Sequence, residues 1–218
     1  MDGLTATLTY DLAGRADGLN VDKLAETVRA QAFAEMPDVV MNMTAGRLGF
    51  SKNIEGGKNF IRALFGENVD ELSAKMAQQW KNVTEKIRWR FVKAGGKINF
   101  LPNWFIPTSH DFRLIQAAGR EKWINDIKPL LDRQQMINFE TKMPLNDKEL
   151  QEVLEKSFDT LASHGLNKYS GKNSLAQKYA GERILHFKDA DSWIKYNETV
   201  TATRLFRLIN ISIIWPTT

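Results

Sequence analysis

The sequence predicts an all-α protein: an irregular helical domain with a long central helix and a buried loop rich in proline and tryptophan. Apolar residues recur at spacings of three and four along most of the chain, which is the period of an amphipathic helix. Capping residues and glycines stand at the ends of these periodic segments. Hydrophobic residues make up 43% of the 218 positions, enough to build a core without disulfide bonds.

The composition excludes several kinds of site. The chain has no cysteine, which excludes disulfides, thiolate metal sites and a cysteine nucleophile. Its formal net charge of +4 permits contact with nucleic acid but does not require it. No apolar run approaches the roughly 20 residues that span a bilayer, and the first residues lack the basic and apolar parts of a signal peptide. We therefore expect neither a membrane span nor secretion by a signal peptide.

The chain divides into three expected segments. These are an N-terminal leader and helix (1–56), a helical core domain (57–198) and a C-terminal tail (199–218). In the first segment, Asn20 is expected to cap a helix over residues 21–34, with Pro37 beyond its end. The glycines of residues 41–57 predict a flexible connector, because the spacing fits neither a P-loop nor G-x-G-x-x-G. A short helix over residues 59–65 is expected to follow.

Residues 69–93 carry the strongest helical pattern in the chain. Apolar side chains at spacings of three and four form a single stripe: Leu72, Met76, Trp80, Val83, Ile87 and Phe91. Asp70 and Glu71 lie in the expected first turn, and Gly95 and Gly96 end the helix. At about 25 residues this helix is expected to be close to 37 Å long. It is the predicted long central helix.

The C-terminal half of this helix is the most basic part of the chain. Basic side chains interleaved with an aromatic ring can follow a phosphate backbone. The candidate nucleic-acid contacts are therefore Lys81, Lys86, Arg88, Trp89 and Lys93. A solvated helix face shows the same scatter of charges, so that interpretation stays open beside a nucleic-acid-binding module using residues 81–97.

Residues 100–136 interrupt the helical pattern with prolines. Pro102 and Pro107 forbid a continuous helix, while the apolar residues around them, Phe100, Leu101, Trp104, Phe105 and Ile106, are expected to plug into the core. Ser109 or Asp111 can cap the next helix, and Gly119 is expected to separate that helix from another. The loop is thus predicted to be buried.

The last third of the chain contains two further predicted helices. Asn146 and Glu149 form a capping box before the apolar stripe Leu150, Val153, Leu154, Phe158 and Leu161. Residues 168–178 predict an exposed polar loop, and residues 183–187 a short extended piece. Asp189 is expected to cap a helix that buries Ala190, Trp193 and Ile194.

His110 and Asp111 are the strongest candidates for chemistry. A His-Asp pair occurs in metal phosphohydrolases, so a hydrolase centred on His110 and Asp111, with His186, is one hypothesis. The other histidines, His164 and His186, are far along the chain, with no H-x-x-x-H or H-E-x-x-H spacing. No G-x-S-x-G is present either. The simpler interpretation makes Asp111 a helix cap and His110 a buried hydrogen-bonding partner. We therefore expect no enzyme, cofactor, metal site or small-molecule substrate.

The order of short motifs in residues 80–198 resembles a region of large structural proteins of tailed bacteriophages and prophages. The pieces are NWFIPTSHD (103–111), AGREKW (118–123), LDRQQM (131–136), MPLNDKELQEVL (143–154), FDTLASHGLNK (158–168) and HFKDADSWIKYNE (186–198). In that family a glutamine is expected near Pro107, where this chain has Thr108.

The resemblance implies a fragment of an internal virion or DNA-ejection protein. Such a protein acts by packing and by contacts with other virion proteins, with itself and with DNA, in the virion or the cytoplasm of the bacterial host. No catalytic residue carries over. The resemblance stops near Glu198, so residues 199–218 are expected to be a truncated or foreign tail whose apolar residues promote self-association. Light scattering before and after deletion of residues 200–218 tests that expectation.

Overall fold

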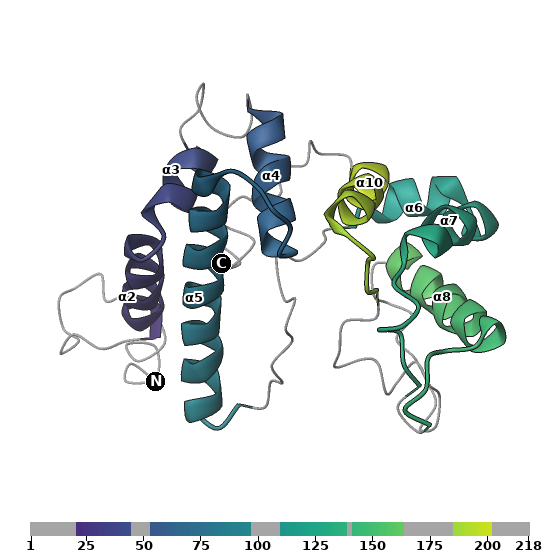
Figure 1. Ribbon diagram of the computed structural model, residues 1–218. Coiled ribbons are helices and arrows are strands. Elements are labelled where there is room, and N and C mark those ends of the chain that lie inside the picture. Colours follow the sequence, from purple (N-terminus) through teal and green to yellow (C-terminus); the bar gives the residue numbers. More distant parts are fainter. Residues whose placement is uncertain (1–20, 45–52, 97–109, 139–140, 164–184, 202–218) are drawn as a thin grey trace.

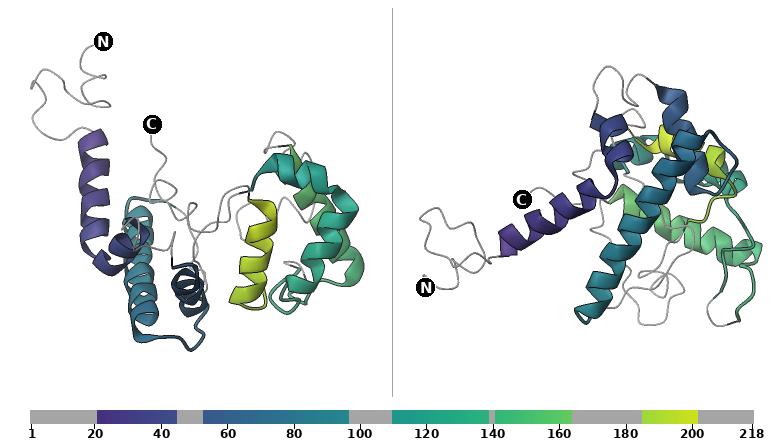
Figure 2. Two further views of the ribbon diagram at one scale, coloured as in Figure 1. Left: turned by 90° about the horizontal axis from the view of Figure 1, so that it is seen from above. Right: turned by 60° about the vertical axis from the view of Figure 1, so that its left-hand side comes forward.

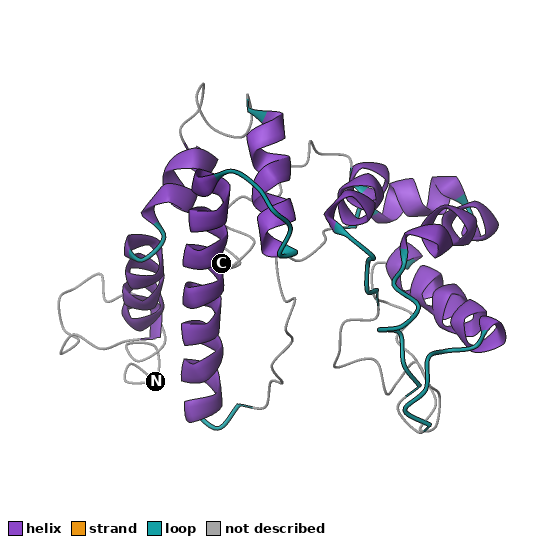
Figure 3. Ribbon diagram, in the orientation of Figure 1, coloured by secondary structure: helices purple, strands orange, loops and turns teal. Residues whose placement is uncertain are grey.

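The described part of the chain is helical throughout its regular structure. The computed structural model describes residues 21–44, 53–96, 110–138, 141–163 and 185–201 (Figure 1). These residues form helices and connecting loops but no β-strand (Figure 3). Their extended pairing consists of two isolated antiparallel bridges, Leu131 with Phe187 and Ile137 with Pro144. The predicted all-α class is therefore confirmed.

The N-terminal half of the fold is built around one long helix. Its elements are α2 (Val21–Ala34), α3 (Pro37–Thr44), α4 (Ile54–Leu64) and α5 (Glu71–Lys93). The carboxylate of Asp70 caps α5 by accepting a hydrogen bond from the Ser73 amide at 2.9 Å. The helix ends before Gly95, where φ is +91°. Because α3 and α4 both pack against α5, it is the long central helix that the sequence predicts (Figure 1).

The C-terminal half is a group of shorter helices. They are α6 (Phe112–Ala118), α7 (Arg120–Ile127), the 3-10 turn η1 (Lys128–Leu130), α8 (Asp147–Ala162) and α10 (Ala190–Val200). Gly119 separates α6 from α7 with a φ of +78°, a left-handed conformation that favours glycine. The predicted capping box of Asn146 and Glu149 opens α8. Both α6 and α7 pack against α8, and α10 contacts α6.

The two halves meet where α10 lies beside α4 (Figure 2). Asp191 near the start of α10 pairs with Arg62 near the end of α4 at 2.9 Å. Glu198 near the end of α10 pairs with Lys58, one turn before Arg62 in α4, at 3.3 Å. The two helices are therefore antiparallel. Glu67, just beyond α4, accepts a hydrogen bond from the Ala190 amide at 2.9 Å, which places a carboxylate at the positive end of α10.

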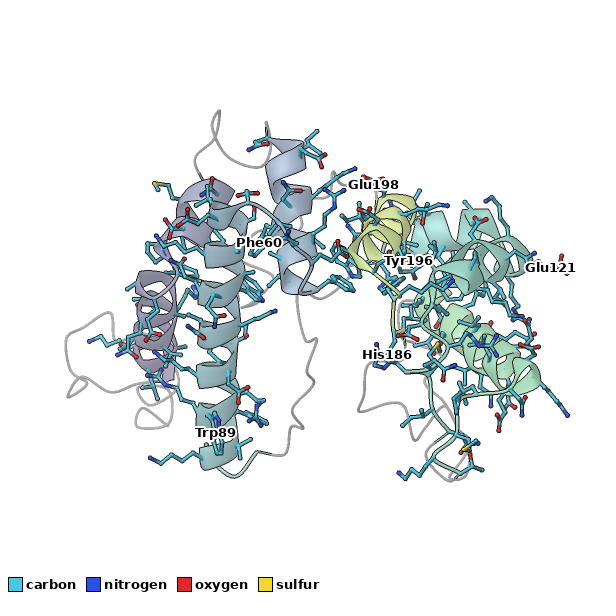
Figure 4. All side chains as sticks on the ribbon, in the orientation of Figure 1. Phe60, Trp89, Glu121, His186, Tyr196 and Glu198 are labelled. Carbon is cyan, nitrogen blue, oxygen red and sulfur yellow. The ribbon has the colours of Figure 1, made fainter. Side chains whose placement is uncertain are left out.

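Buried aromatic side chains form the centre of each half. In the N-terminal half, Trp80 of α5 meets Phe60 of α4 edge-to-face with ring centroids 6.3 Å apart. In the C-terminal half, Trp123, Trp193 and Tyr196 are buried. Figure 4 labels Phe60 between α4 and α5 and Tyr196 on α10. Aromatic residues bury large apolar areas, so these side chains dominate the packing of both halves.

Two predictions about the N-terminal half are wrong. Residues 37–44, expected to lie after a helix and in a glycine-containing connector, form α3 and pack against α5. Gly56 and Gly57 lie inside α4, because the side chain of Asn53 caps that helix by accepting a hydrogen bond from the Gly56 amide at 2.9 Å. The expected segment boundary between residues 56 and 57 therefore falls within one helix.

The predicted apolar stripe of α5 is correct only in its middle. Met76, Trp80 and Val83 are buried, but Leu72 is 47% exposed and Phe91 is 54% exposed. The neighbouring helices α3 and α4 lie beside the N-terminal half of α5, where its buried residues are, rather than along its whole length (Figure 1). In α6, Leu114 is likewise exposed, whereas Ile115 is buried. The proline-tryptophan loop (97–109), the polar loop (168–178) and the tail (202–218) lie outside the described residues.

Candidate functional site

The basic half of α5 places Trp89 on the face opposite the core. Trp89 follows the buried Trp80 by nine residues, about two and a half helical turns, so the two side chains leave the helix in opposite directions. Trp80 is 2% exposed, whereas Trp89 is 59% exposed. Figure 4 shows Trp89 near the C-terminal end of α5, away from the helices of the other half.

The four basic side chains among the candidate nucleic-acid contacts have different surroundings. Lys86 forms an ion pair with Glu35 at the end of α2. Arg88 donates hydrogen bonds from Nε and Nη2 to the Glu85 carboxylate, at 2.8 and 2.7 Å. This contact holds the pKa of the Glu85 carboxyl below its usual range. Lys81 is half-buried and Lys93 is exposed.

An arginine also covers the exposed indole. The guanidinium carbon of Arg88 lies 5.2 Å from the centroid of the Trp89 ring, within cation–π distance. The structure therefore brings Lys86, Arg88, Trp89 and Lys93 together along the last two turns of α5, with Lys81 farther back along the same helix. The nucleic-acid contact of these five residues remains a prediction.

His110 and Asp111 hold the start of α6 against α10. The Asp111 carboxylate caps α6 by accepting a hydrogen bond from the Arg113 amide at 2.9 Å. The Asp111 amide in turn donates to the Val200 carbonyl at 2.8 Å. His110 Nε2 lies 3.0 Å from the Tyr196 hydroxyl, within hydrogen-bond distance. Both residues therefore have structural partners in the C-terminal half.

Tyr196 is the centre of this contact. Its ring lies 5.2 Å from Phe187 and 6.3 Å from Trp123, centroid to centroid, and its side chain is 2% exposed. Burial raises the pKa of the Tyr196 hydroxyl, so this group stays neutral at ordinary pH. A neutral phenol packed among aromatic rings can hold an imidazole in place. It offers no ionised nucleophile.

The described residues do not assemble a metal centre around His110. Within residues 21–44, 53–96, 110–138, 141–163 and 185–201, no group of three or more histidines and carboxylates could hold a metal ion. The carbonyl oxygen of His186 accepts a hydrogen bond from the Asp132 amide at 2.8 Å, which ties that histidine's backbone to the segment after η1. His164 lies outside the described residues. The hydrolase hypothesis thus lacks a visible ligand set in this part of the chain.

Asp111 offers a direct test of its capping role. Asparagine caps helices about as well as aspartate, so Asp111→Asn should leave the free energy of unfolding within about 0.5 kcal/mol of the parent. Asp111→Ala should lower it by about 1 kcal/mol, because the Arg113 amide loses its acceptor. Urea denaturation followed by circular dichroism measures both. Equal destabilisation by Asn and Ala would contradict the capping role.

Sequence patterns alone did not single out two residues that matter to these contacts. Tyr196 follows Trp193 by three residues, a helical spacing that marks a shared face, but nothing in the sequence connects it with His110. Arg62 carries no motif, yet its guanidinium contacts Glu55, Asn59 and Asp191. His110 lies 86 residues from Tyr196, and Asp191 lies 129 residues from Arg62. Only the folded arrangement shows these contacts.

Comparisons with known proteins add no relative. The chain matches no protein-family model, no curated protein and no solved structure. Among the described helices, none is both long enough and apolar enough to cross a bilayer.

Proposed function

We propose that this chain is part of an internal virion or DNA-ejection protein of a tailed bacteriophage or prophage. In this role it works by packing and by contacts with other virion proteins rather than by catalysis. Its place is the virion, or the host cytoplasm before assembly. The observation that carries the proposal is the ordered set of motifs in residues 80–198 that resembles such proteins.

The positions of the motif residues in the fold support a structural role. Gly119 makes the turn between α6 and α7, and Asn146 and Asp189 cap α8 and α10. Trp123 is buried against the rings of Phe158 in α8 and Tyr196 in α10. Phe187 forms an isolated β-bridge with Leu131, just after η1. Among the described residues, these motif positions are thus turns, caps and core side chains. Turn, cap and core residues determine a fold rather than carry out chemistry. Their presence in the motifs supports a structural role for the chain.

The alternative of a hydrolase centred on His110 and Asp111 has less support. The Asp111 carboxylate caps α6, and His110 Nε2 lies within hydrogen-bond distance of the hydroxyl of buried Tyr196. A general base must reach a substrate proton directly or through one water molecule. These contacts explain both residues without a substrate.

Particle association tests the proposed role. An antibody against the chain would follow it through purification of phage particles on a density gradient, after induction of the host that carries the gene. We expect the protein to band with full particles and to resist removal by a salt wash. A soluble bacterial protein of similar size, followed in the same gradient, controls for trapping. Recovery of the chain only in the soluble fraction would overturn the proposal.

A further inference from the structure

The solvent face of the distal half of α5 lies opposite the core, and one ion pair, from Lys86 to Glu35, joins it to the end of α2. We propose that this Trp89 face, made of Lys81, Lys86, Arg88, Trp89 and Lys93, binds single-stranded nucleic acid. The binding does not depend on the proposed role in the virion. A failure to bind would leave the particle-association test unaffected, and a failure of that test would leave this binding unaffected.

Positive charge is concentrated on the distal half of α5. Residues 81–93 contain five cations, Lys81, Lys86, Arg88, Arg90 and Lys93, and one carboxylate, Glu85. Their net charge of +4 equals the formal net charge of the whole chain, which is also +4. The remaining residues are therefore balanced, and the entire excess lies on about half of one helix. A polyanion is the partner that this distribution attracts.

An exposed indole lies at the centre of those charges. Lys86 precedes Trp89 by three residues and Lys93 follows it by four, so both lie within about one turn of the ring on the same side of the helix. The guanidinium of Arg88 lies over the ring at 5.2 Å. A nucleotide presents a flat base beside an anionic phosphate. An exposed aromatic ring between cations matches both parts.

The existing ion pairs do not prevent this binding. The side chains of Lys86 and Glu35 are 63% and 43% exposed, so water screens their attraction. Exposed pairs of this kind contribute little to stability and exchange partners readily. Phosphate groups can therefore compete with Glu35 for Lys86. Arg88 keeps its place over Trp89 while Glu85 holds it, which prepares the stacking surface.

Geometry favours a single strand over other polyanions. Bases of a duplex are stacked on one another and hide their faces, whereas those of a single strand are available to Trp89. Binding to a flat anionic bilayer would require exposed aromatic side chains that lie on one side of the helix and insert into the bilayer together. Trp89 and Phe91 are two residues apart and lie roughly 160° from each other around α5. The arrangement is that of a stacking ring on a basic strip.

Fluorescence anisotropy of a labelled single-stranded oligo-dT tests the proposal with the full chain. At ~50 mM salt we expect measurable binding, which Trp89→Ala weakens roughly 5- to 100-fold without changing the salt dependence. Lys93→Ala should reduce the slope of log affinity against log salt by about 0.7, the value for one phosphate contact on a single strand. Lys148→Ala, at an exposed lysine in the first turn of α8, is the matched control and should change neither quantity. Circular dichroism verifies that every variant folds.

Several results would overturn the assignment. One is the absence of oligo-dT binding at ~50 mM salt with a folded chain. Another is a Trp89→Ala variant that binds as tightly as the parent, because stacking would then play no part. Equal competition by a duplex of the same sequence length would remove the preference for single strands. Sedimentation with phosphatidylglycerol vesicles, without oligo-dT binding, would assign the face to a lipid surface instead.

Discussion

Trp80→Ala is expected to lower the free energy of unfolding by about 3–5 kcal/mol, the range for removing a large aromatic side chain from a core. Trp80 is 2% exposed and packs edge-to-face against Phe60, joining α5 to α4. Its loss leaves a cavity at the centre of the N-terminal half. Since whole domains are stable by only about 5–15 kcal/mol, this variant should be at or near the limit of folding.

Two matched variants make the Trp80 prediction specific. Trp89→Ala removes the same side chain from the exposed face of the same helix and should change stability by no more than about 0.5 kcal/mol. Trp80→Phe keeps an aromatic ring and removes an indole N–H that has no hydrogen-bond partner among the described residues. Its expected cost is below about 1.5 kcal/mol. Urea denaturation curves measure all three, and similar losses for the two alanine variants would refute the assigned burial.

The helix ends were predictable because they depend on a few neighbouring residues. Asp111 and Asp189 cap the helices that follow them, as expected, and Asn146 with Glu149 forms the expected capping box. Asp70, expected in the first turn of α5, is its cap instead. A cap requires one side-chain acceptor within three residues of an unpaired amide. That condition can be read from the sequence without knowledge of the tertiary structure.

The missed helix α3 shows how a local signal can have two meanings. Pro37 follows α2 and was interpreted as the end of helical structure. Proline is equally suited to the first turn of a new helix, where its missing N–H is not needed, and Pro37 is the first residue of α3. The glycines in the first turn of α4 were ambiguous for a similar reason, because Asn53 supplies a cap that outweighs the low helix propensity of Gly56.

Which part of α5 is covered could not be predicted from its periodicity. The apolar stripe runs the whole length of the helix, whereas the buried residues of α5 all lie between Ser73 and Val83. Ser73 and Ala77 are buried although neither belongs to the predicted stripe. Small residues of this kind allow close approach of a neighbouring helix. That approach is a property of the tertiary arrangement.

The candidate site was predictable in its residues but not in its pairing. The basic segment and Trp89 are adjacent in the sequence, so their presence on one helix followed from the helical period. The Lys86–Glu35 pair joins residues 51 positions apart, and the His110–Tyr196 contact joins residues 86 apart. These long-range contacts decide which charges are balanced and which histidine has a partner.

Tyr196 is the second residue whose replacement should have a large effect. Its buried ring contacts Phe187 and Trp123, and its hydroxyl lies 3.0 Å from His110 Nε2. Tyr196→Ala should therefore lower the free energy of unfolding by about 3–5 kcal/mol. Tyr196→Phe keeps the ring and loses only the hydrogen bond, which should cost about 0.5–1.5 kcal/mol at neutral pH.

Measurements at alkaline pH separate the contribution of the buried hydroxyl to stability from that of the ring. Burial raises the pKa of Tyr196 in the folded protein, while the unfolded chain releases the phenolic proton near pH 10. Above that pH the unfolded state binds fewer protons than the native state, so the free energy of unfolding falls as the pH rises. Below it both states keep the proton, and Tyr196 adds no pH dependence.

Above pH 10, Tyr196 is expected to lower the free energy of unfolding by up to about 1.4 kcal/mol per pH unit. Tyr196→Phe cannot ionise and should lack this part of the slope, so the stability difference between parent and variant should shrink as the solution becomes alkaline. Urea denaturation of both chains at about pH 8 and about pH 11 measures the difference. Parallel behaviour of the two chains would show that the hydroxyl is not protected by burial. It would also remove the basis for assigning His110 a partner in the core rather than a substrate.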